Sequence, residues 1–146
     1  ESPGFQRRLV LLERLRVTPS DQGRCSRMST PEGKVKDWLV SQFISYYGKD
    51  IWKYAPPGGM FGQAGQADRF FLIHGVFVVI EVKAEGKKIT PLQRARLVAA
   101  KDGGAVAASM IGKDYGQLQR IFMEIDKRAK VNLTYLRSEE DDVPPV

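Results

Sequence analysis

Two apolar segments separated by a two-residue turn constrain the fold of this chain more than any other feature. Residues 69–73 and 76–84 are rich in aromatic and β-branched side chains, and His74-Gly75 stands between them. Such segments around a tight turn predict a β-hairpin, with His74 taking the positive φ of the turn. Because the run from Val76 to Ile80 is apolar at every position, the second strand is expected to be buried on both faces.

The register of this hairpin brings charged side chains together. If Ile73 pairs with Val76, counting outward along both strands places Asp68 opposite Glu81. Opposed carboxylates repel each other unless a cation lies between them. Lys83 follows two positions after Glu81 and therefore projects from the same face. Two acidic oxygen ligands beside an ammonium suit a hard divalent cation and the hydrolysis of a phosphodiester.

Alternating charges also have an ordinary explanation, because they are typical of the solvated face of an amphipathic strand. Charges at the end of a buried central strand, in contrast, are where sites form. Both interpretations of Glu81 and Lys83 stay open on the residues alone.

Capping signals predict two helices. Ser29 as N-cap with Glu32 three positions later forms a capping box, and an apolar stripe follows until Gly48. Thr90 with Gln93 repeats the pattern ahead of a helix that ends at Gly103-Gly104.

Shorter elements complete the order helix, strand, hairpin, helix, strand, helix. The sequence predicts strands at Ile51–Tyr54 and Ala105–Ile111, a last helix capped by Asp114, and an edge strand over Val131–Leu136. The fold class is therefore mixed α/β (α+β), a small mixed sheet with a central hairpin flanked by helices.

Charge and composition divide the chain into three parts. Residues 1–27 hold six Arg and no Lys and are interpreted as a leader or upstream extension outside the core. Residues 28–137 form one basic domain, and 138–146 are expected to be an acidic, disordered tail.

The composition excludes several classes of protein. A single cysteine, Cys25, and a single histidine rule out a disulfide framework and a Cys/His zinc site. The lone cysteine favours an intracellular setting. No apolar run approaches the ~18 residues of a membrane span, so we expect no membrane partner. The 23 basic against 17 acidic residues, a net charge of +6, favour a polyanionic partner such as nucleic acid.

Several stretches resemble the VRR-NUC group of PD-(D/E)xK nucleases, over about residues 29 to 112. The matching stretches are Ile51-Trp52-Lys53, the glycine-rich loop after it, Gly65-Gln66-Ala67-Asp68-Arg69, Ile80-Glu81-Val82-Lys83-Ala84, Gly86-Lys87-Lys88 and Pro91-Leu92-Gln93. Ala67 stands where the name-giving motif has Pro. The resemblance implies a restriction-endonuclease-like core.

The resemblance also implies roles for individual residues. Asp68, Glu81 and the Val82 carbonyl would be metal ligands, with Lys83 the catalytic lysine. Glu32 matches the acid of the family's first helix and would be a further ligand, and Gln93 would orient Lys83, a water or a phosphate. For Glu32 and Gln93, a plain capping role is the alternative.

Exposed cations and glycines around this site would contact the DNA backbone. These candidates are Lys53, Gly58, Gly59, Lys87, Lys88 and Arg94. Trp38, Trp52 and the Tyr46-Tyr47 pair are expected to be core or dimer contacts rather than base-stacking residues.

The sequence thus predicts an endonuclease that hydrolyses phosphodiester bonds of DNA with Mg²⁺ or Mn²⁺ and needs no small-molecule cofactor. Because no base-reading module is evident, we expect recognition of DNA structure, such as a Holliday junction, a flap or a nick. The resemblance implies a homodimer and, if phage-encoded, a protein of the bacterial cytoplasm. A non-catalytic nucleic-acid-binding protein on this fold and an RNA-directed nuclease are the alternatives.

Overall fold

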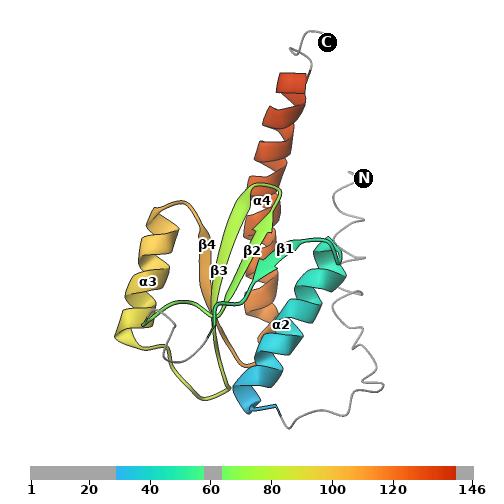
Figure 1. The fold of residues 1–146 in the computed structure, drawn as a ribbon. Helices are drawn as coiled ribbons and strands as arrows, with labels where there is room; N and C mark the ends of the chain where they lie inside the picture. The colour runs from blue at the N-terminus through green and yellow to red at the C-terminus, as the bar shows by residue number, and fades with distance from the viewer. Residues whose placement is uncertain (1–28, 58–63, 141–146) are drawn as a thin grey trace.

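The computed structural model describes residues 29–57 and 64–140, which form a mixed sheet with helices on both faces (Figure 1). The elements follow the predicted order. They are α2 (Pro31–Tyr47), β1 (Trp52–Tyr54), β2 (Arg69–Ile73), β3 (Val76–Lys83), α3 (Pro91–Asp102), β4 (Val106–Ile111) and α4 (Tyr115–Glu140). None of the helices within these residues is both long and apolar enough to cross a membrane.

The sheet has the strand order β1-β2-β3-β4, so the longest strand, β3, is internal. The predicted hairpin is confirmed: β2 pairs antiparallel with β3, with Ile73 opposite Val76, and His74 has a φ of 47° in the turn. β4 runs parallel to β3 and lies on its other side. A parallel neighbour requires a crossover connection, and α3 supplies it.

The two faces of the sheet are covered unequally. The main core lies between the sheet and helices α2 and α4, where Phe43 stacks on Phe71 and packs edge-on against Phe122. On the opposite face, α3 makes a smaller cluster in which Leu97 packs with Val79 and Ala105. Figure 1 shows α3 beside β4 and β3, with β1 at the opposite edge of the sheet.

The prediction that β3 is buried on both faces is wrong at one position. Val76, Val78, Val79 and Ile80 are buried, but the side chain of Phe77 is 42% exposed. Phe77 lies opposite Leu72, which is also exposed, on the part of the sheet that α3 leaves uncovered. Trp52, predicted as a core or dimer contact, is likewise exposed on the edge strand β1 and is not a core residue.

The cap of the first helix also differs from the prediction. Thr30, not Ser29, is the N-cap of α2, and its side chain accepts a hydrogen bond from the Gly33 N–H. This choice puts Pro31 at the first helical position, where its missing N–H costs nothing. Glu32 is therefore not a capping-box residue, and its carboxylate takes part in other contacts.

The predicted edge strand over Val131–Leu136 is wrong, because α4 continues through this segment to Glu140. Contacts earlier in the helix and at Asn132 support the continuation: Ala129 is buried, and the Asn132 side chain donates to the His74 carbonyl in the hairpin turn. Ser138–Glu140, predicted as part of a disordered tail, are helical, and 141–146 lie outside the described residues. The predicted leader, residues 1–27, lies outside them as well.

Candidate active site

Asp68 and Glu81 meet where the hairpin strands end. Asp68 directly precedes β2, and the register of Arg69 with Ile80 brings Glu81 opposite it. The Val82 N–H donates to Asp68 Oδ2 over 2.9 Å, which fixes this carboxylate against β3. The expected pairing of the two acids is therefore present in the fold.

Helix α2 adds a third acid and a cation from the neighbouring layer. Lys36 lies one turn after Glu32, and its Nζ is 2.8 Å from Glu32 Oε1 and 2.7 Å from Asp68 Oδ1. Burial by itself lowers the pKa of Lys36, but its hydrogen bonds to Asp68 and Glu32 and their charges outweigh burial, so the pKa lies above the usual 10.5. Sequence reasoning missed Lys36, although the four-residue spacing from Glu32 was a signal for it.

Lys83 joins the acids from the end of β3. Its Nζ is 3.2 Å from Glu81 Oε1 and 4.0 Å from Glu32 Oε2, and its side chain is mostly buried. The structure thus brings together Glu32, Asp68, Glu81 and Lys83, which come from three separate elements.

Gln93 links this cluster to helix α3. Its Oε1 accepts from the Thr90 N–H over 2.8 Å, while the Thr90 hydroxyl accepts from the Gln93 N–H, so the predicted capping box is confirmed. The other end of the same amide, Nε2, donates to Glu81 Oε1. Gln93 thus caps the helix through one atom of its side chain and contacts Glu81 through another. Its expected role in orienting Lys83, a water or a phosphate stays a prediction.

Glu81 is almost fully buried, and its surroundings disfavour the charged form of its carboxyl group. The residue is 1% exposed, and its Oε2 is buried without a hydrogen-bond partner. Burial, followed by the charge of Asp68, raises the pKa of Glu81 from 4.5 to about 7, against the opposing effect of Lys83. A buried acceptor without a partner is costly, and a bound cation would satisfy it.

The donor chemistry of the cluster fits a hard divalent cation, because all three acids offer carboxylate oxygens. Within residues 29–57 and 64–140, no three His, Cys, Asp or Glu side chains come close enough to hold a metal ion in the present arrangement. The ammonium of Lys36 bridges Glu32 and Asp68 in this arrangement. Coordination by both acids thus requires Lys36 to release at least one of them.

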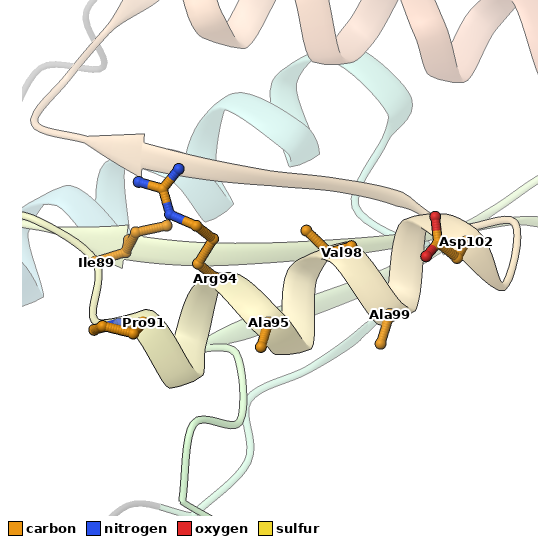
Figure 2. A pocket seen from close by; sticks show the side chains of 7 residues that line it. All are labelled: Ile89, Pro91, Arg94, Ala95, Val98, Ala99 and Asp102. Atoms are coloured by element: carbon orange, nitrogen blue, oxygen red, sulfur yellow. The ribbon is translucent and has the colours of Figure 1, made fainter.

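The predicted DNA contacts lie at several places on the surface. Lys53 is exposed on β1, and Lys87 and Lys88 are exposed after β3, whereas Gly58 and Gly59 lie outside the described residues. Arg94 lines a groove along α3, and Figure 2 shows Arg94 and Val98 on the side of α3 that faces β4. A role for these residues in DNA binding, and for the Val82 carbonyl as a ligand, stays a prediction.

Comparison with known proteins adds no relative to this picture. The chain matches no family model, no curated protein and no solved structure.

Proposed function

We propose that this protein is a divalent-metal-dependent DNA endonuclease with a restriction-endonuclease-like core. The observation that carries the proposal is the cluster of Glu32, Asp68, Glu81 and Lys83, which come from helix α2, the residue before β2 and strand β3. Carboxylates that can hold a divalent cation, beside an ammonium, suit the hydrolysis of a phosphodiester.

Each residue has a role that its contacts support. When bound to these carboxylates, Mg²⁺ or Mn²⁺ would polarise a phosphoryl oxygen and lower the pKa of a bound water. Lys83, held 3.2 Å from Glu81, offers an ammonium to the negative charge that develops on the phosphate. Gln93 and the Val82 N–H orient Glu81 and Asp68, respectively.

The substrate follows from the size and charge of the protein. A net charge of +6 favours nucleic acid, and no base-reading module is evident among the described elements. We therefore propose recognition of DNA structure, as in branched or nicked DNA, by a homodimer.

Cleavage of a supercoiled plasmid and of a synthetic four-way junction tests the proposal. We expect cutting with Mg²⁺ or Mn²⁺, none with EDTA, and a loss of at least about 100-fold in rate for Lys83→Ala. Lys127→Ala, at an exposed lysine on α4, is the matched control and should cut normally.

Three results would contradict parts of the proposal. DNA binding without cutting under every metal would favour the non-catalytic alternative. Preferential cutting of an RNA junction of the same sequence would make the protein an RNA-directed nuclease. Normal cutting by Lys83→Ala would refute the role of this lysine.

A further inference from the structure

An exposed row of aromatic and apolar side chains lies on the same face of the sheet as Glu81 and Lys83 of the candidate active site. Alternation along β3 places Phe77 on one face with Glu81 and Lys83, and alternation along β2 places Phe70 and Leu72 there with Asp68. The register adds β1 to this face. We call this surface the aromatic face; its members are Trp52, Tyr54, Phe70, Leu72 and Phe77.

The aromatic face is open to solvent. Trp52 is 51% exposed, Tyr54 46%, Leu72 45% and Phe77 42%. Phe70 packs against the α3 cluster at the boundary of the face. A contiguous exposed apolar surface of this kind marks a binding site more often than a scattered exposed residue does.

The rings form a continuous ladder across three strands. The centroids of Trp52 and Tyr54 are 6.3 Å apart with planes at 26°, those of Tyr54 and Phe70 are 6.1 Å apart, and those of Phe70 and Phe77 are 5.7 Å apart at 21°. Flat, half-exposed rings on a sheet are suited to stacking with nucleobases, which every base permits because each has a π-face.

The position of the ladder favours nucleotides over a protein partner. Phe70 lies two residues after Asp68, which directly precedes β2, and projects from the same face, so a base stacked at this end of the ladder has its backbone close to that acid. The positive net charge of the chain attracts phosphates. The aromatic face therefore continues the candidate active site rather than forming a separate surface.

We propose that unpaired nucleotides next to the scissile phosphate stack on the aromatic face. This inference rests on the proposed nuclease function and specifies its substrate: DNA with a single-stranded segment at the cleavage position, such as a flap or a gap. A fully paired duplex keeps its bases stacked inside the helix and cannot offer them to Trp52 without unpairing.

Tryptophan fluorescence provides a test that is independent of cleavage. The chain has two tryptophans; Trp38 is buried against Tyr115, so an added oligonucleotide can stack only on Trp52. In EDTA, we expect unpaired oligothymidylate of about 12 nucleotides to quench the emission and a duplex of equal length to quench far less.

Variants then measure the contribution of the ladder. By anisotropy of a labelled oligonucleotide, Trp52→Leu and Tyr54→Leu should each weaken binding about tenfold or more. Met123→Leu, at an equally exposed apolar residue on α4, should not. Circular dichroism and thermal unfolding of each variant verify that the edge strand is still folded.

The outcomes separate this inference from the proposed function. Suppose that no DNA is cut, but single strands quench Trp52 and the variants lose binding. Stacking of nucleotides on the aromatic face is then supported, and the proposed nuclease function is refuted. If branched DNA is cut but Trp52→Leu and Tyr54→Leu bind single strands like the wild type, the inference is overturned. It is also overturned if single strands do not quench and Trp52→Leu instead turns a dimer into a monomer, which makes the face a contact between copies.

Discussion

At the scale of single residues, Lys36 bridges Glu32 and Asp68, with its ammonium within 2.8 Å of an oxygen of each. This ammonium offsets part of the negative charge of the two carboxylates in the metal-free protein and competes with a divalent cation for them. Lys36→Met keeps the apolar stem and removes the charge. We expect the variant to bind Mg²⁺ about tenfold more tightly, a gain of about 1.4 kcal/mol, and to be less stable than the wild type in EDTA.

Isothermal titration of Mg²⁺ and urea unfolding in EDTA measure both effects. Lys34→Met, at an exposed lysine on the same helix, is the control and should change neither quantity. Unchanged or weaker Mg²⁺ binding by Lys36→Met would show that Lys36 helps to hold the bound ion rather than compete with it.

The raised pKa of Glu81 predicts that the stability of the protein depends on pH. Its pKa in the folded protein is about 7, above its ordinary value of 4.5, so the folded state binds the proton more tightly than the unfolded state does. The stability that comes from the protonated group is therefore fully present below about pH 4.5 and is lost as the pH rises through 7. The loss amounts to at most about 3 kcal/mol.

Urea unfolding in EDTA between about pH 5 and pH 8 tests this dependence by comparing the wild type with Glu81→Gln. Glutamine keeps the shape of the side chain without a titrating proton. The free energy of unfolding of the wild type should fall relative to the variant as the pH rises. Parallel profiles of the two proteins would contradict a raised pKa at Glu81.

The sequence predicted most of the residues in this cluster, and a simple reason explains the exception. Asp68, Glu81 and Lys83 belong to one hairpin, whose register can be counted from the turn. Lys36 reaches Asp68 only because α2 packs across the sheet from another layer. A contact of that kind depends on tertiary packing, which spacing along the chain does not determine.

At the scale of elements, the residues that cap the start of α3 also contact the candidate active site. The Thr90 side chain caps the helix, while the Gln93 side chain both completes the capping box and donates to Glu81. Thr90→Ala should lower the free energy of unfolding by about 1 kcal/mol and leave Mg²⁺ affinity unchanged. Gln93→Ala should also weaken Mg²⁺ binding about tenfold, since Glu81 loses the donor that orients it.

Urea unfolding and Mg²⁺ titration of the two variants distinguish the roles. If Thr90→Ala weakens Mg²⁺ binding as much as Gln93→Ala does, the cap as a whole positions the site and the amide of Gln93 has no separate effect. If Gln93→Ala binds Mg²⁺ as tightly as the wild type does, Gln93 does not contribute to metal binding.

Elements with local signals were predictable and those decided by packing were not. Thr90-Pro91 and Thr30-Pro31 begin both helices in the same way, but only the first was assigned to the correct cap residue, because Ser29 offered a competing capping box. The β-rich composition of Val131–Leu136 suggested a strand. In the fold, Asn132 bonds to the hairpin turn from a continuing helix, so tertiary contact overrides local propensity there.

At the scale of the whole molecule, the fold divides its work between the two faces of the sheet. Helices α2 and α4 bury the main core on one face, and the other face carries Glu81, Lys83 and the aromatic face, while Glu32 reaches the acids from α2. This division was only partly predictable: the sequence indicated the hairpin and the order of elements, but not which strands are edges or which helices share a face. Those choices arise from packing among elements that are distant along the chain.

A polar cluster ties the two core helices together. The phenols of Tyr46 and Tyr47 on α2 both donate to the carboxylate of Asp126 on α4. Burial, reinforced by Asp126, raises the pKa of each phenol well above 10, so both remain donors throughout the neutral range. The carboxylate is the shared acceptor, and its removal leaves two partly buried hydroxyl groups without their partner.

We therefore expect Asp126→Ala to lower the free energy of unfolding by about 1–3 kcal/mol, because two hydrogen bonds to a charged acceptor are lost together. Asp126→Asn keeps one carbonyl acceptor and should cost less than Asp126→Ala. Asp37→Ala, at an exposed aspartate on α2, should stay within about 0.5 kcal/mol of the wild type. Urea unfolding at neutral pH measures all three variants. If Asp126→Ala is as stable as Asp37→Ala, water replaces the carboxylate fully, and the packing of Phe43 and Phe122 alone holds α2 against α4.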